Sequence, residues 1–133
     1  TRAALDAGID AGVAGGRLTD ISHAVELAAI AGGASVIREY GGHGIGRDLH
    51  EDPHILNYGP AGRGPRLKVG HVLAIEPILS LGSPDVEVAA DGWTTITTDG
   101  SLAAHFEHTV ALTAAGPSIL TLPAGQPAVG APV

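Results

Sequence analysis

The amino-acid sequence predicts an α+β fold, with helices first and an antiparallel sheet after them. Apolar residues recur at helical spacing only within the first 33 residues. From residue 35 onward, short apolar and β-branched runs alternate with turns rich in glycine, proline and aspartate, at the spacing of hairpins. With 133 residues, of which 44% are hydrophobic, the chain is long enough for one domain with a core of its own.

The first third of the chain predicts two helices. Residues 1–13 are rich in alanine and carry apolar side chains at helical spacing, and the glycine pair at 15–16 ends that helix. Thr19 is suited to be the N-cap of a second helix, because its hydroxyl can accept a bond from a free backbone N–H of the first turn. This second helix is expected to run from residue 20 until the glycine pair at 32–33.

The rest of the chain predicts strands joined by turns. The expected strands are residues 35–40, 53–58, 71–76, 78–81, 86–90, 93–97, 102–112 and 118–122. Asp91-Gly92 favours a hairpin turn between two of them. Residues 41–52 are expected to form a glycine-rich loop, and residues 123–133 a loose tail of proline, glycine and alanine. The folded domain is therefore expected to span residues 1–122.

Composition limits the classes of partner. The net charge of −7 argues against nucleic acid, because phosphate binding needs a basic surface. No apolar run approaches the roughly 20 residues that cross a bilayer, and no secretory signal opens the chain, so we expect a soluble, cytoplasmic protein without membrane contact. The absence of cysteine excludes disulfides, thiolate metal sites and a cysteine nucleophile. Methionine is absent even at position 1, and the chain starts inside a helix-favouring stretch, which suggests a fragment of a longer protein.

Two histidines lie in the glycine-rich stretch. His43 stands among four glycines, and His50 follows seven residues later. Glycine allows tight turns and close approach of the backbone to a ligand, and imidazole binds metals and transfers protons. The alternative is a glycine-rich surface loop with incidental histidines.

Two glutamates occupy positions where strand patterns place them against the core or on a sheet face. Glu76 ends the apolar run of residues 72–75, where an unpaired carboxylate is disfavoured. Glu107 lies between His105 and Thr109 on one face of the predicted strand 102–112. The alternative for Glu107 is the solvated face of an edge strand.

One histidine and two carboxylates on separate elements indicate a metal site with nitrogen and oxygen ligands. His43, Glu76 and Glu107 make up this predicted set. Such sites without sulfur suit Mn, Fe, Co or Zn in hydrolytic chemistry. From the residues alone, the sequence predicts a possible metal hydrolase.

The order of these motifs resembles the C-terminal half of the type I methionine aminopeptidases, which have the pita-bread metallopeptidase fold. The matching stretches are VIREY at 36–40, GHGIGR at 42–47, HEDP at 50–53, IEP at 75–77, DGWT at 91–94 and FEHT at 106–109. The resemblance covers residues 1 to 122 and implies an incomplete pita-bread fold, with a curved antiparallel sheet and flanking helices. Xaa-Pro peptidases share that fold and its ligand types, and they remain an alternative.

The resemblance also implies a role for each site residue. His43, Glu76 and Glu107 would bind two divalent metal ions, with Glu107 bridging them and Glu76 also serving as general base. His50 would bond the scissile amide and stabilise the tetrahedral intermediate, and Trp93 would wall the pocket for the methionine side chain. The implied substrate is the N-terminal methionine of nascent polypeptides, and the implied state of the complete protein is a monomer.

The sequence departs from the family pattern in what it lacks. Two further aspartate ligands of the family lie farther upstream of the histidine than the 42 residues present here. Asp6, Asp10 and Asp20 are too close to His43 to replace them. Leu49 stands where the family often has an aromatic residue. We therefore expect little activity from this chain alone, and a non-catalytic binding module of the same fold is a further alternative.

Overall fold

The computed structural model describes residues 1–124, which form two helices and ten strands. The helices are α1 (Arg2–Ala11) and α2 (Leu18–Ala31). The strands are β1 (Ser35–Val36), β2 (Gly42–Gly44), β3 (Glu51–Ile55), β4 (Val72–Ile75), β5 (Ile78–Ser80), β6 (Val86–Val88), β7 (Thr95–Thr97), β8 (Ala103–His105), β9 (His108–Thr113) and β10 (Gly116–Ile119). The predicted α+β order is confirmed. Most of the tail predicted at 123–133 lies outside the described residues.

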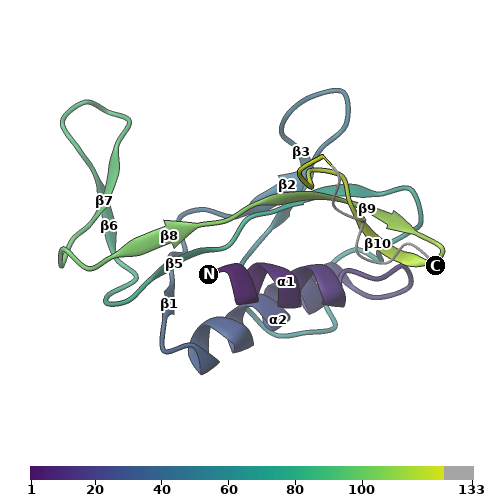
Figure 1. Ribbon diagram of the computed structural model, residues 1–133, viewed down its shortest axis with the longest axis horizontal. Coiled ribbons are helices and arrows are strands. Elements are labelled where there is room, and N and C mark those ends of the chain that lie inside the picture. The colour runs from purple at the N-terminus through teal and green to yellow at the C-terminus, as the bar shows by residue number, and fades with distance from the viewer. Residues whose placement is uncertain (125–133) are drawn as a thin grey trace.

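All strand pairs are antiparallel, and they form three sheets. The largest has the order β10-β9-β4-β2-β3, a second has the order β1-β5-β8, and β6 pairs with β7 as a separate hairpin. The first two sheets are continuous along the chain, because β4 leads directly into β5 and β8 directly into β9. Figure 1 shows these strands arching over the two helices.

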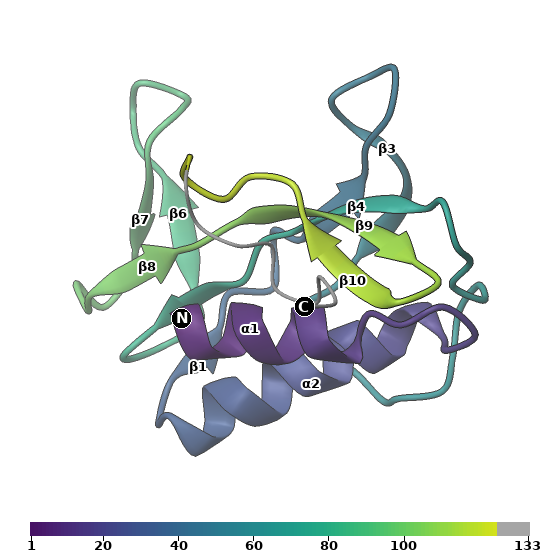
Figure 2. The ribbon, with the colours of Figure 1, turned by 45° about the vertical axis from the view of Figure 1, so that its right-hand side comes forward.

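The helices cover one face of the arched sheet, and the core lies between the two layers (Figures 1 and 2). Leu73 and Ile75 of β4 are almost completely buried, as are Val110 and Leu112 of β9, and they pack in one cluster with Leu5, Ile9, Leu18 and Ile21 of the helices. Burying such a side chain contributes about 1.5–3 kcal/mol. The alternate residues of β4 and β9 therefore face away from the helices, and that second face is free to carry polar groups.

The start of the second helix differs from the prediction. Helix α2 begins at Leu18, and its N-cap is Arg17 instead of Thr19. The Asp20 carboxylate accepts a hydrogen bond from the backbone N–H of Arg17 at 2.7 Å. This bond ties the third residue of the helix to its N-cap residue. The hydroxyl of Thr19 instead accepts from the Arg63 N–H at 2.8 Å and donates to the Arg63 carbonyl at 3.1 Å. The Thr19 hydroxyl, which was expected to cap the helix, is therefore bonded to a loop residue distant in the sequence.

One loop prediction and three strand predictions are also corrected. The glycine stretch expected as a loop contains β2, and the strand expected at 35–40 pairs only over β1. The long strand expected at 102–112 is interrupted at Phe106-Glu107, which leaves β8 and β9 in different sheets. In the predicted hairpin, β6 and β7 stop early because the Asp91 carboxylate accepts from the N–H groups of Trp93 and Thr94.

Within residues 1–124, neither helix has the length and apolar character that a bilayer crossing needs.

Candidate metal centre

The pairing register of β2, β4 and β9 determines which of their side chains project from the face of the sheet that lies away from the helices. His43 of β2 lies opposite Ala74 of β4, and Ala74 lies opposite Thr109 of β9. Directly opposed residues in an antiparallel pair project to the same face. Ala74 alternates with the core residues Leu73 and Ile75, so this row faces away from the helices. His43 therefore points to the side of the sheet that the helices leave uncovered.

Both glutamates lie where the two sheets meet. Ile75 pairs with His108, and Ile78 pairs with His105, so Glu76-Pro77 and Phe106-Glu107 interrupt the ladder at the same level. The only backbone bond across this gap among the described residues runs from the Phe106 N–H to the Pro77 carbonyl at 3.4 Å. Proline cannot donate to a ladder, which explains the interruption on its own strand. The two carboxylates therefore come from the same interruption, on neighbouring segments of the chain.

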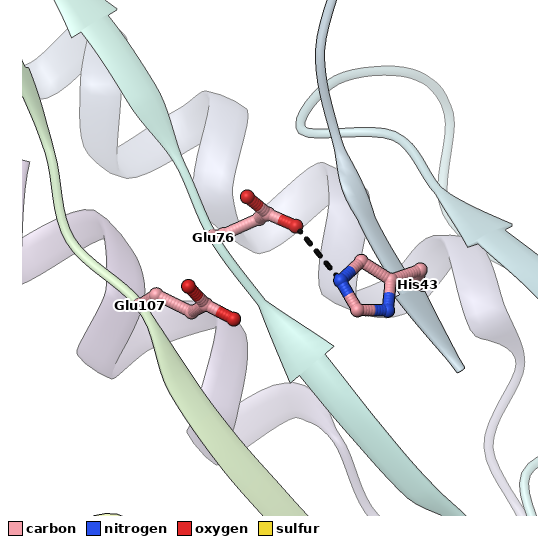
Figure 3. A group of neighbouring side chains, drawn as sticks. All are labelled: His43, Glu76 and Glu107. Atoms are coloured by element: carbon pink, nitrogen blue, oxygen red, sulfur yellow. Dashed lines mark ion pairs between the residues drawn. The ribbon is translucent and has the colours of Figure 1, made fainter. Parts of the chain in front are cut away.

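Three side chains converge at this level. Ligand atoms of His43, Glu76 and Glu107 all lie within 4.8 Å of one another. Figure 3 shows the three side chains pointing into one space, His43 from β2 and the two glutamates from the segments that link β4 to β5 and β8 to β9. His43 is buried, Glu76 is half-buried, and Glu107 is exposed, so the site is open on the side of Glu107. The structure thus brings together the three residues that the sequence predicted as metal ligands.

The hydrogen bonding of His43 prepares one ring nitrogen for a cation. Its Nδ1 lies 2.8 Å from the Gly44 carbonyl oxygen, which can only accept, so Nδ1 carries the proton and Nε2 keeps its lone pair. That Nε2 lies 3.3 Å from Oε1 of Glu76. A bare nitrogen and a carboxylate oxygen repel at this distance unless a proton or a metal ion lies between them. One imidazole and two carboxylates are also a usual donor set for divalent transition metals, so the residues fit a metal ion.

Burial raises the pKa of the Glu76 carboxyl above its usual value, and the negative charge of Glu107 adds to the rise. His43 and His105 oppose the shift without cancelling it. A raised pKa means that the folded chain holds a proton on Glu76 more tightly than the unfolded chain. In the metal-free chain, folding stability therefore increases as the pH falls through the raised pKa and decreases as the pH rises through it.

We expect Glu76→Gln to make the metal-free chain more stable at about pH 7.5, and to leave stability unchanged at about pH 4.5. The amide is neutral at every pH, so it removes the cost of a buried carboxylate that only the wild type has at the higher pH. Urea unfolding of both chains in a chelating buffer measures the difference. Glu87→Gln, which changes an exposed residue of β6, is the matched control and should have no such effect. Equal stability of Glu76→Gln and wild type at both pH values would contradict the prediction.

The two other predicted site residues lie outside this donor group. The rings of His50 and His43 have centroids 4.4 Å apart, although His50 belongs to the exposed segment between β2 and β3. Both rings line an open cleft of about 450 Å³ with residues of β3. Trp93 is 89% exposed in the turn of the β6–β7 hairpin. This hairpin and the β2–β3 connection both project from the sheet on the side opposite the helices (Figure 2).

One residue of the site was not predicted. Nε2 of His105 lies 3.3 Å from Oε2 of Glu76, so each oxygen of this carboxylate faces an imidazole. The sequence does contain a signal for it, because His105 lies two residues before Glu107 and strand alternation places both on one face.

Comparison with known proteins identifies the family of the chain. Residues 1–114 match the model of metallopeptidase family M24. The chain belongs to this family. Its metallopeptidase character implies a divalent metal cofactor, which agrees with the donor group of His43, Glu76 and Glu107.

Individual relatives agree with this assignment. The chain is 55% identical over 128 residues to methionine aminopeptidase 1 of Mycobacterium tuberculosis, covering 92% of the chain and 48% of that protein. Its structure matches methionine aminopeptidase from Thermotoga maritima with a TM-score of 0.90 and 50% identity, over 92% of this chain and 49% of that one. It also matches prolidase from Pyrococcus furiosus with a TM-score of 0.62 and 23% identity, over 90% and 30% of the two chains.

These matches confirm the predicted pita-bread fold. They also show that the chain spans about half the length of the curated relatives it matches.

Proposed function

We propose that this chain is the C-terminal part of a methionine aminopeptidase, which hydrolyses the peptide bond after the N-terminal methionine of nascent polypeptides. The observation that carries the proposal is the convergence of His43, Glu76 and Glu107 in a chain 50% identical to a solved methionine aminopeptidase. By the resemblance, two aspartates from a preceding segment would complete a site for two ions of Co, Mn, Fe or Zn. A cytoplasmic location and a monomeric state remain predictions.

His43, Glu76 and Glu107 would hold the metal centre. His43 would use Nε2, the nitrogen that its bond to the Gly44 carbonyl leaves with a lone pair. Glu107, the exposed member of the group, would supply carboxylate oxygens to the same centre. When bound, divalent metal ions supply Lewis-acid polarisation of the scissile carbonyl and lower the pKa of a water molecule.

Glu76 is the proposed general base. In the metal-free chain, partial burial raises the pKa of this carboxyl. A carboxylate held beside the metal centre is placed to act as a general base. It would take a proton from the attacking water and deliver it to the leaving amine. Deprotonated Glu76 is also the form that binds the metal, so base and ligand roles need the same charge state.

His50 is the proposed partner of the substrate amide. Its ring lies beside that of His43 at 4.4 Å between centroids and lines the same cleft, so a peptide bond at the metal centre would be within reach of its N–H. A donor aimed at developing oxyanion charge lowers the barrier of acyl transfer. Trp93, in the β6–β7 hairpin, would form one wall of the pocket for the methionine side chain of the substrate. Its exposed ring would be covered by the substrate and by the proposed preceding segment.

A Xaa-Pro peptidase of the same fold is the second candidate. Prolidase and dipeptidase structures match the chain at 21–25% identity, against 40–50% for the methionine aminopeptidase structures. The difference in identity favours methionine aminopeptidase. A non-catalytic binding module would have no need to keep all three donors in one group.

We expect the full-length protein, loaded with Co²⁺, to release methionine from Met-Ala-Ser and to leave Ala-Pro peptides intact. The 133-residue chain alone should be slower by roughly 100-fold or more, because it lacks part of the ligand set. Release of free amino acid, measured by chromatography, is the assay, and full-length Glu76→Gln is the inactive control. Preference for Ala-Pro peptides would favour the Xaa-Pro peptidases, and inactivity on both substrates would favour a binding module.

A further inference from the structure

Glu76 is held between two imidazoles, and only one of them belongs to the metal-binding group. Nε2 of His43 lies 3.3 Å from Oε1, and Nε2 of His105 lies 3.3 Å from Oε2. The donor group with ligand atoms within 4.8 Å of one another contains His43 and Glu107 but not His105. His105 therefore contacts the other oxygen of the carboxylate and lies outside the group formed by the other two donors.

The backbone holds His105 at this place. It is the last residue of β8 and pairs with Ile78, which begins β5 immediately after Glu76-Pro77. His105 thus lies across the interruption from Glu76, on the neighbouring strand. Its side chain is 44% exposed, and the ring also lines an apolar cavity of about 260 Å³ with Tyr40 and Ile96.

We propose that His105 is a positioning residue that fixes the rotation of the Glu76 carboxylate. The terminal torsion of glutamate is broad, so a carboxylate held at one oxygen can rotate. The contact of His105 Nε2 with Oε2, at 3.3 Å, would hold the second oxygen and keep Oε1 directed at His43. Hydrogen-bond partners behind a ligating carboxylate orient it in this way and raise metal affinity. The inference rests on the proposed function, since it assigns Glu76 as ligand and base.

Titration of the 133-residue chain with Co²⁺ tests this role without any peptidase assay. We expect His105→Ala to weaken Co²⁺ binding by about tenfold and to change the visible absorption of the bound ion. His105→Gln should keep wild-type affinity, because its amide N–H lies at about the position of Nε2. The control is His71→Ala. His71 lies just before β4, whereas Glu76 lies just after it, so this variant should bind Co²⁺ as the wild type does. Wild-type affinity in His105→Ala, or failure of His105→Gln to restore it, would overturn the proposal.

Ring ¹⁵N spectra of the metal-free chain test the contact itself. Glu76→Gln should shift the ring signals of both His43 and His105 and leave those of His71 in place. Unchanged His105 signals would overturn the proposal even if metal affinity were altered. These results are separate from the proposed function: a full-length protein that releases no methionine would refute the peptidase assignment, whereas the Co²⁺ and ¹⁵N results decide the role of His105.

Discussion

Replacing His43 with alanine is expected to abolish tight binding of divalent metal, with a loss of affinity greater than about 100-fold, since even changes to residues behind the ligands cost 10–100-fold. His43 is the only nitrogen donor in the group, and it is the most buried of the three donors. Without it, two carboxylates remain, and one of them is exposed. Such a pair has no preference for transition metals over Mg²⁺ or Ca²⁺.

Calorimetric titration with Co²⁺ measures this loss, and His54→Ala is the matched control. His54 lies directly opposite His43 in the β2–β3 pair, so both variants remove one imidazole from the same row of the sheet. We expect His54→Ala to bind Co²⁺ as the wild type does. Comparable losses in the two variants would mean that the affinity comes from scattered surface histidines and would contradict the assigned centre.

Two of the three candidate ligands could be predicted from the sequence because each departs from its local pattern. Glu76 follows a run of buried apolar residues, and a carboxylate at that place needs a partner. His43 lies among glycines that make a close approach possible. A residue that contradicts its local pattern is more often functional than one that fits. These conflicts, together with the order of the motifs, predicted the three candidate ligands, whereas the fold class was predicted from the spacing of apolar residues and turns.

The features that the sequence did not predict depend on contacts between distant segments. Thr19 has the chemistry of an N-cap, but Arg63 takes both bonds of its hydroxyl. The alternation around Glu107 is that of an unbroken strand, whereas Phe106 and Glu107 lie outside the ladder, across from Glu76-Pro77. Local propensity cannot contain information of this kind. The alternation does place His105 on the face of Glu107, but its contact with Glu76 depends on the register between β5 and β8, which the spacing does not give.

The glycines on either side of His43 are the tightest points of the site. A Cβ added to Gly42 would lie 2.2 Å from the Ala74 carbonyl oxygen, and one added to Gly44 would lie 2.2 Å from the Asp52 carbonyl oxygen. Both obstacles are backbone atoms of the paired strands β4 and β3, which cannot move without breaking their own ladders. Strands β3 and β4 can therefore pair closely with β2 beside His43 only because the residues before and after His43 have no side chain.

Gly42→Ala is accordingly expected to destabilise the chain by roughly 3 kcal/mol and to weaken Co²⁺ binding at the same time. The strand must move away from β4 to admit the methyl group, and His43 moves with it. Gly32→Ala is the matched control: Gly32 has an ordinary φ of −82°, and its added Cβ would make only normal contacts at 3.4 and 3.5 Å. Urea unfolding should show a cost below about 1 kcal/mol for the control, with unchanged metal binding. A Gly42→Ala chain as stable as Gly32→Ala would mean that β2 can separate from β4 at no cost. That result would contradict the conclusion that close pairing of these strands positions His43.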